Sequence, residues 1–257
     1  KYFLVPNVKN FSWMTVVSAM GQMFYSLSIA MGILITFGSY MKKDTAIEDS
    51  TRNVEIFDTG IAIMAGLMII PAVFAFSGGD PDTLQAGPSL MFITIPKVFQ
   101  NMGFGTVIGI VFFLLVLFAA VTSSIALTES AVSTFEDELG WGRKKATVLV
   151  GVIMLALGSL SSLGYGPLAG IKIIGMQFLD LFDFLTNSVM MPIAALLTSL
   201  FVSRVVGIDK IEEEIIHGES AFRRKKVFVV MIKYLCPVFA IIILLSSVAN
   251  ALGWIKM

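Results

Sequence analysis

Gly21-Gln22-Met23-Phe24-Tyr25-Ser26-Leu27-Ser28-Ile29-Ala30-Met31-Gly32 lies inside an apolar segment that runs from residue 14 to residue 40. About 20 apolar residues suffice to cross a bilayer, so this segment is long enough to span one. Its middle disfavours a continuous helix, because glycine lowers helix propensity and serine offers the backbone competing hydrogen bonds. Backbone freed at that depth must line a cavity or be buried in protein, which points to the midplane binding site of a secondary transporter. Close helix packing through small residues is the equally open alternative.

Composition places the chain among integral membrane proteins. Its 257 residues are 56% hydrophobic and 14% charged, and the mean hydropathy is +0.88. Soluble domains are typically about 45–50% apolar and about 25% charged. The formal net charge is zero, so no basic surplus points to nucleic acid as a partner. We therefore expect an all-α, polytopic helical membrane protein that binds no nucleic acid.

Six apolar segments are candidates for spanning helices. Between the second and the third lies 78–106, which prolines interrupt, and we expect it to be an external loop with short helices. The first residue is Lys1, with no signal peptide after it, and we expect that preceding spans have been lost. The six expected spans of this single membrane domain are residues 14–40, 57–77, 107–128, 146–163, 186–206 and 227–252.

Charge placement predicts the orientation of these spans. Basic residues gather after the first, third and fifth spans, for example at Lys42, at Arg143 and over 223–226. Loops rich in lysine and arginine face the cytoplasm. The opposite loops and the two chain ends, which we expect outside, hold only Lys1, Lys9, Lys97, Lys172 and Lys256.

Polar residues inside the expected spans are candidates for function, because such groups are costly in a bilayer. Thr122-Ser123-Ser124 lies deep in the third span, and hydroxyl and carbonyl oxygens are the ligands that a hard cation requires. The simpler interpretation is that these hydroxyls bond back to carbonyls one turn earlier. Asp58 opens the second span, where it is either an acidic residue at a helix N-terminus or, if 49–55 extends the helix, a cation ligand within the membrane.

Several motifs in sequence order resemble the bacterial neurotransmitter:sodium symporter family, and the resemblance extends over nearly the whole chain. They are 21–28, Phe37-Gly38-Ser39-Tyr40, Ala65-Gly66 with 71–76, Thr122-Ser123-Ser124-Ile125-Ala126 and Phe135-Glu136-Asp137-Glu138-Leu139. The chain is similar to the sixth through eleventh spanning helices of that family. The resemblance implies the leucine-transporter-type fold, of which this chain would hold the second inverted repeat plus one further helix, without the N-terminal repeat. It also implies the inner membrane of a bacterium.

The resemblance implies a substrate site around the break in the first span. Tyr25 would be an aromatic lid over the substrate, and Met31 and Leu127 would line a pocket for its side chain, which favours a hydrophobic amino acid. The full set of substrate residues implied is Tyr25, Ser26, Leu27, Ser28, Met31, Ser123 and Leu127.

The resemblance also implies two sodium sites and a gate. Ser26 and Asp58 would contribute to the first sodium site, and the carbonyl of Ala119 with Thr122 and Ser123 to the second. Gln22 and Ser26 fall where chloride-dependent relatives hold their anion, but Asp58 would supply the negative charge there, so we expect no chloride requirement. The residues expected at the gate are Gln22, Tyr25 and Asp183.

These features predict sodium-coupled symport of a hydrophobic amino acid by alternating access. The expected partners are the amino acid, sodium ions and membrane lipid, and a homodimer is left open. An enzyme is not expected, since the single histidine, His217, lies in a polar loop. A channel is not expected either, because no repeated pore loop is found. The remaining alternative is a proton-coupled or other-substrate transporter of the same inverted-repeat fold, in which Asp58 would titrate.

Overall fold

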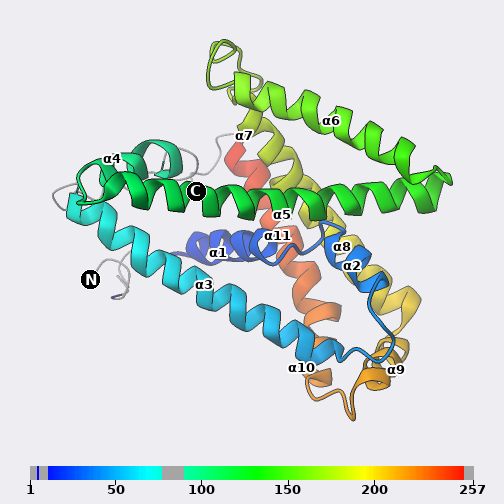
Figure 1. The fold of residues 1–257 in the computed structure, drawn as a ribbon. Helices are drawn as coiled ribbons and strands as arrows, with labels where there is room; N and C mark the ends of the chain where they lie inside the picture. The colour runs from blue at the N-terminus through cyan, green and yellow to red at the C-terminus, as the bar shows by residue number, and fades with distance from the viewer. Residues whose placement is uncertain (1–4, 6–10, 77–89, 252–257) are drawn as a thin grey trace. The chain divides into compact units, whose positions relative to one another are not determined.

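A computed structural model of the chain describes residues 5, 11–76 and 90–251. Within these ranges the chain is mainly helical (Figure 1). Lys1, Lys9, Lys256 and the portion 78–89 of the expected external loop lie outside the described residues.

The first expected span consists of two helices. α1 covers Trp13–Ser26 and α2 covers Ile33–Ser39, with a non-helical stretch between them. The break between the two blue helices can be followed in Figure 1. Neither half is long enough to cross a bilayer alone, since a spanning helix needs about 20 residues.

Five longer helices are long and apolar enough to cross a membrane, counted over the described residues: Ile47–Ala75, Gly105–Leu139, Arg143–Leu163, Phe178–Val206 and Lys225–Ala251. The helix α3 itself runs over Ile47–Phe76, so the extension considered over 49–55 is helical. α5 covers Gly105–Leu139 and α6 covers Arg143–Leu163.

The last two long helices are built from several helical pieces. The first comprises α7 (Phe178–Asp183), a π-helical stretch over Phe184–Met190, α8 (Met191–Phe201) and a second π-helical stretch over Val202–Val206. The second comprises α10 (Lys225–Val230), a π-helical stretch over Met231–Leu235 and α11 (Cys236–Ala251). Two shorter helices complete the described set: α4 (Ile95–Gln100), which continues a π-helical turn over Leu90–Thr94, and α9 (Ile208–Gly218).

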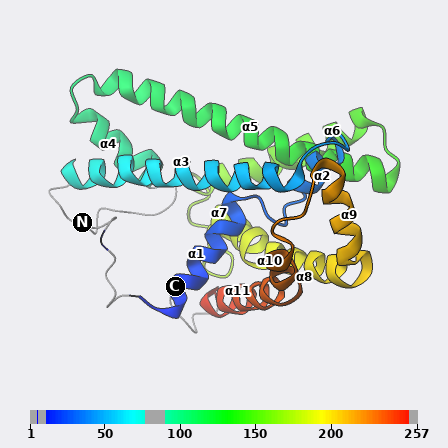
Figure 2. The same ribbon diagram turned by 90° about the horizontal axis from the view of Figure 1, so that it is seen from below.

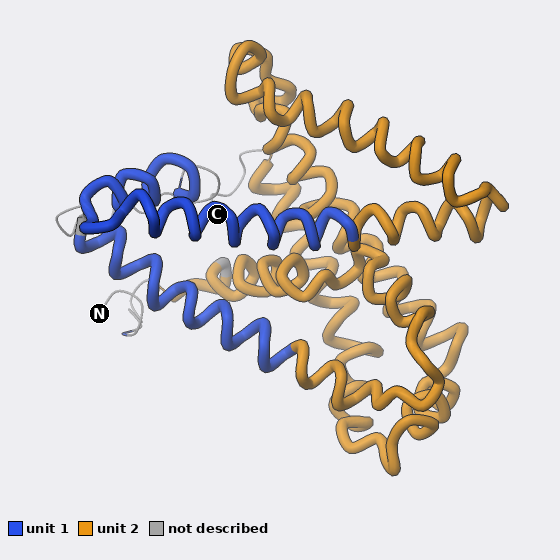
Figure 3. The backbone as a smooth tube through the Cα atoms, viewed as in Figure 1, with its two compact units in different colours: residues 1–10, 55–125 blue, residues 11–54, 126–257 orange. Residues whose placement is uncertain are grey.

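The chain divides into two compact units, coloured separately in Figure 3. The first holds residues 1–10 and 55–125, which include most of α3, all of α4 and the first part of α5. The second holds residues 11–54 and 126–257. Its best-packed pair is α8 with α11, and α1 also lies against α11 (Figure 2).

Burial is sparse in both units, and apolar side chains cover most of the helix surfaces. Val73 in the first unit and Val132 in the second are each 1% exposed, while many spanning leucines and phenylalanines are more than half exposed. A helix surface that is apolar all round suits lipid or neighbouring spans rather than water.

Candidate functional site

The break between α1 and α2 contains an unusual run of left-handed backbone. Ser28 has φ 53°, Ala30 has φ 63° and Gly32 has φ 81°. Left-handed φ costs a residue other than glycine about 1–2 kcal/mol, and such strain gathers at functional sites. Three of the five residues 28–32 have left-handed φ, which interrupts the helical i to i+4 hydrogen bonds. Backbone carbonyl groups without a helical partner can bind a ligand.

Each half of the broken helix is held by its own neighbours. α1 begins with a capping box in which the Ser12 side chain accepts a hydrogen bond from the Thr15 backbone N–H at 3.3 Å. It then lies along α11. α2 instead touches α5, through Thr36 and Tyr40. The two halves therefore contact different helices of the same unit.

The residues expected to bind substrate lie mainly at this break. Tyr25 and Ser26 lie in the last turn of α1, of which Ser26 is the final residue, and the expected gate residue Gln22 lies one turn earlier. Leu27, Ser28 and Met31 follow in the non-helical stretch. The backbone N–H of Ser28 donates to the carbonyl of Tyr25 at 3.1 Å, which closes the helix end. Leu127 and Ser123 lie on α5, one turn apart.

The residues expected at the second sodium site lie on α5, and the Thr122 hydroxyl is hydrogen-bonded to the Ala119 carbonyl oxygen. The Thr122 hydroxyl donates to the carbonyl of Ala119 at 3.0 Å and to that of Phe118 at 3.1 Å. This is the back-bonding common for threonine in spanning helices. The same contact places a hydroxyl oxygen and a carbonyl oxygen side by side, and Ser123 is the next residue.

Asp58 lies well inside α3 rather than at its start. The helix begins at Ile47, so Asp58 is about three turns, or roughly 16 Å, along it at 1.5 Å per residue. Asp58, Ala119, Thr122 and Ser123 belong to the first unit. The second unit contains the other expected site residues, namely Gln22, residues 25–31, Leu127 and Asp183.

Asp183 lies at the end of α7 and lines a small pocket within the second unit. The cavity has a volume of about 260 Å³, and its lining includes Asp180, Asp183, Ser188, Ser247 and Asn250. The Asn187 side-chain amide donates to Asp183 Oδ1. On the loop before α7, burial and the nearby charge of Asp180 raise the pKa of Tyr165 above its usual value.

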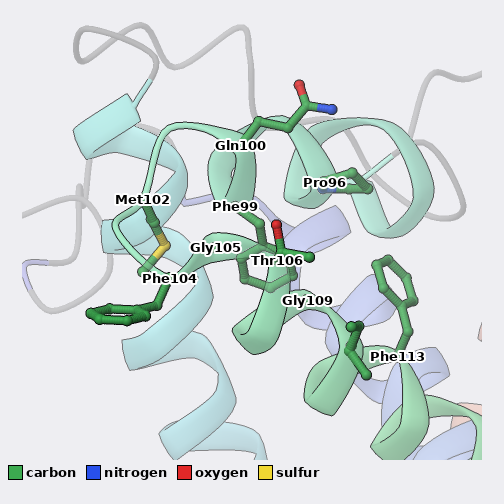
Figure 4. Close-up of a pocket in the computed structure, with 10 residues that line it drawn as sticks. Pro96, Phe99, Gln100, Met102, Phe104, Gly105, Thr106, Gly109 and Phe113 are labelled. Carbon is green, nitrogen blue, oxygen red and sulfur yellow. The ribbon is translucent and has the colours of Figure 1, made fainter.

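A larger pocket, of about 540 Å³, lies in the first unit between α4 and the start of α5 (Figure 4). The Phe99 ring lies beside the first turns of α5. A side chain at Gly105 would meet the carbonyl oxygen of Phe99 at 1.7 Å, so only glycine fits there. None of the expected substrate or sodium residues lines this pocket.

Polar contacts between helices were not anticipated from the sequence. Thr36 on α2 bonds to Ser130 on α5 at 3.4 Å, and Tyr40 bonds to Glu129 at 2.7 Å. Thr36 and Tyr40, the residue that follows α2, are four positions apart and so lie on one face of the helical turn, a spacing that can be read from the sequence. Nothing in the sequence identified their partners on α5.

A second unanticipated network joins two loops expected on the cytoplasmic side. Glu219, which follows α9, accepts hydrogen bonds from the backbone N–H groups of Glu48 and Asp49 at 2.6 and 3.2 Å. In return, Glu48 Oε2 accepts from the backbone N–H of Arg223 at 2.8 Å. The charge pattern placed the loops after the first and fifth spans on one side of the membrane, and here they are in contact.

Clusters of three or more histidine, cysteine, aspartate or glutamate residues arranged for a metal ion are absent from the described part of the chain. The sodium ligands expected from the sequence are mostly of another kind, namely hydroxyl and carbonyl oxygens with a single carboxylate. Hard cations bind such oxygen ligands.

Comparison with known proteins gives a consistent set of similarities. A family model described as the sodium:neurotransmitter symporter family matches residues 1–254. The uncharacterized sodium-dependent transporter YhdH of Bacillus subtilis is 31% identical over 249 residues, covering 96% of this chain and 54% of the relative. A sodium-dependent transporter of Haemophilus influenzae is 30% identical over 248 residues, covering 96% and 53%.

The crystal structure of MhsT in complex with L-phenylalanine is similar in fold and sequence. The TM-score is 0.80 at 35% identity, over 90% of this chain and 51% of MhsT. The chain therefore spans about half the length of the relatives it matches.

Proposed function

Because this chain belongs to the sodium:neurotransmitter symporter family, we propose that it forms the second half of a sodium-coupled symporter for a hydrophobic amino acid. It is a multi-pass membrane protein with five helices of spanning length among the described residues, and its fold is of the leucine-transporter type. The remaining ligands would belong to the part of such a symporter that this chain, which spans about half the length of its relatives, does not match.

The observation that carries the proposal is the break between α1 and α2. Left-handed φ at Ser28, Ala30 and Gly32 accompanies the interruption of the first expected span, and broken helices of this kind form the cargo sites of secondary transporters. The substrate ammonium would bind backbone carbonyls in this break. Its side chain would lie between Met31 and Leu127, and Met adapts well to ligands of differing shape. That MhsT was crystallised with L-phenylalanine supports a hydrophobic, and in particular an aromatic, amino acid.

Sodium would bind as cargo at two places. Ser26 and Asp58 would contribute a hydroxyl and a carboxylate oxygen to the first. The Ala119 carbonyl with the Thr122 and Ser123 hydroxyls would contribute to the second. At the second place a cation would take over the carbonyl oxygen that now accepts the Thr122 hydroxyl proton, and the hydroxyl would turn to offer its own lone pair.

Coupling follows from electrostatics and linkage. A substrate carboxylate and Asp58 near one sodium ion lower the cost of placing that ion in a low-dielectric interior. If sodium and substrate each favour binding of the other, the coupling is reciprocal, so the sodium gradient drives substrate uptake. Asp58 would also supply the negative charge near Gln22 and Ser26, and transport is then expected to proceed when gluconate replaces chloride.

The experiment that tests the proposal is binding of a panel of radiolabelled amino acids to the full-length symporter in detergent, in sodium and in potassium. We expect one hydrophobic amino acid to bind in sodium only. Asp58→Ala should weaken that binding at least about tenfold, the loss expected when a charged hydrogen-bonding ligand is removed. Asp209→Ala, on α9 outside the spanning helices, is the matched control and should bind as the wild type does.

Equal binding in sodium and potassium, with Asp58→Ala indistinguishable from wild type, would contradict the sodium assignment. If binding instead follows pH and Asp58→Asn abolishes that dependence, the protein is the proton-coupled transporter of the same fold. Binding of a charged or very small amino acid alone would contradict the hydrophobic pocket.

A further inference from the structure

One face of α2 meets α5 through small and hydroxyl-bearing residues. Gly32 and Thr36 lie four residues apart and thus on the same side of α2. Opposite them on α5 lie Ser130 and Ser133. We call these four residues the α2–α5 seam. All four belong to the second unit.

α2 and α5 approach closely at Gly32, the N-terminal end of the seam on α2. A side-chain Cβ at Gly32 would lie 2.7 Å from Oγ of Ser130, and Gly32 has φ 81°. Both facts exclude other residues, because a left-handed φ strains an L side chain and because no space exists for one. Gly32 therefore sets how near the start of α2 lies to α5.

Hydroxyl groups complete the seam one turn below. Thr36 is 8% exposed and Ser130 is 7% exposed. The Thr36 hydroxyl donates to Ser130 Oγ at 3.4 Å and lies 3.3 Å from Ser133 Oγ. The Ser133 hydroxyl also bonds to the Ser130 carbonyl at 3.1 Å. Buried hydroxyls must find partners, so these contacts, although longer than the usual O–H···O distance of about 2.5–3.0 Å, favour the register of α2 on α5 in which Thr36 faces Ser130 and Ser133.

The seam adjoins the expected substrate pocket on both helices. Met31 directly precedes Gly32 in the chain. Leu127 lies three residues before Ser130 on α5, and residues three apart on a helix are neighbours on its surface. Whatever fixes Gly32 against Ser130 therefore also fixes the distance between Met31 and Leu127.

We propose that Thr36 and Ser130 are positioning residues for the substrate pocket, acting through Met31 and Leu127. They touch no substrate themselves. This inference rests on the proposed function for its consequence in binding, but its geometric part stands on the seam alone. Loss of the Thr36 hydroxyl lets α2 shift on α5, and the pocket between Met31 and Leu127 widens or closes.

The closing experiment uses the full-length symporter and measures both parts. Thr36→Val removes the hydroxyl at nearly constant shape, Thr36→Ser restores it, and Ser130→Ala removes the partner without adding volume. The matched control is Thr134→Val. The Thr134 hydroxyl donates within α5, to the Ser130 carbonyl at 2.8 Å, so Thr134→Val removes a hydroxyl of the same helix and leaves the Thr36 hydroxyl in place.

The geometric readout needs no substrate. Met31→Cys and Leu127→Cys are introduced together on a Cys236→Ser background and joined with a short bifunctional thiol reagent. We expect Thr36→Val and Ser130→Ala to change the yield of the cross-link, and Thr36→Ser and Thr134→Val to leave it as it is. An unchanged yield in Thr36→Val and Ser130→Ala overturns the inference, whatever the protein transports.

The binding readout is the ratio of affinities for a small and a large hydrophobic amino acid, leucine and phenylalanine. Thr36→Val is expected to change this ratio about three- to tenfold, the effect of one lost hydrogen bond, and Thr36→Ser to restore it. A merely structural role would lower both affinities or the melting temperature equally, and that result contradicts the inference. If the wild type binds neither amino acid while the cross-link still depends on Thr36, the proposed function falls and the positioning role of the seam stands.

Discussion

The hydroxyl of Tyr40 at the end of α2 donates a hydrogen bond to Oε1 of Glu129 on α5, over 2.7 Å and across 89 positions of sequence. Oε2 of the same carboxylate accepts from Nη2 of Arg143, the first residue of α6, at 2.6 Å. Arg143 also lies 3.3 Å from Oε2 of Glu136. One carboxylate therefore joins three helices at the side expected to face the cytoplasm.

This network predicts that substitutions of its members lower the melting temperature by unequal amounts. Glu129→Gln should lower the melting temperature of the full-length protein in detergent more than Tyr40→Phe does, because the glutamate serves two partners and the tyrosine one. In the Glu129→Gln background, Tyr40→Phe should have little further effect, since residues in one network are not additive. Fully additive shifts in melting temperature would show that the two side chains act independently.

Glu219 provides the N-terminal cap of α3. Its Oε1 accepts from the backbone N–H groups of Glu48 and Asp49, which have no partner within the helix. A negative charge there also suits the helix dipole. Glu219→Ala is expected to cost about 1 kcal/mol, as lost caps do, and Glu219→Gln less because the amide oxygen still accepts. Hydrogen exchange should rise in peptides that cover 47–51. A rise confined to other regions would contradict the capping role.

Gly218 allows the loop after α9 to approach the backbone before α3. A Cβ at this position would lie 2.3 Å from the carbonyl oxygen of Thr45 and 2.6 Å from its carbonyl carbon. Gly218→Ala must therefore displace backbone, and the adjoining cap by Glu219 should weaken with it. We expect a lower melting temperature and faster exchange over 47–51. Gly151→Ala is the control, because beyond the adjacent residues of its own helix no atom lies within 4 Å of the added Cβ, and it should not accelerate exchange there.

The sequence predicts that the first span is broken. It does not predict the residues at which the break begins and ends. Gly21 lies within α1 and Gly38 within α2, because a glycine costs a helix only about 1 kcal/mol relative to alanine. Gly32 marks the end of the break because φ 81° requires it. Left-handed Ser28 and Ala30 could not be predicted, since that conformation is unfavourable for both residue types.

From the sequence, the position of Asp58 along its helix depended on whether the helix begins before the apolar segment 57–77. Hydropathy alone began the span at 57, whereas the structure begins α3 at Ile47. The polar residues from 48 to 55 belong to this helix, and Glu219, 170 positions from Asp49 in sequence, caps its start. The Thr36 contact with Ser130 likewise joins residues 94 positions apart. Local patterns predict helices, but contacts of this range depend on the assembled fold.

Thr122 is the residue at which the two interpretations of the hydroxyl cluster in α5, a sodium ligand or a back-bonded hydroxyl, can be separated by experiment. Its hydroxyl bonds back to the carbonyls of Phe118 and Ala119, as threonines in spanning helices often do. Ser161 on α6 makes the same kind of bond, to the Leu157 carbonyl at 3.0 Å, and is absent from the expected sodium sites. The two residues thus share a local structure and differ in proposed role.

If Thr122 binds sodium, Thr122→Val should raise the sodium concentration needed for half-maximal substrate binding about tenfold, while Ser161→Ala leaves it unchanged. The reason is that valine keeps the shape of threonine but offers the cation no oxygen. Thr122→Ser, which keeps the oxygen, should retain sodium binding close to that of the wild type. Titration of substrate binding with sodium in the full-length protein measures all three variants. Equal responses of Thr122→Val and Ser161→Ala would mean that Thr122 only bonds back to its own helix, and the second sodium site would then lose a ligand.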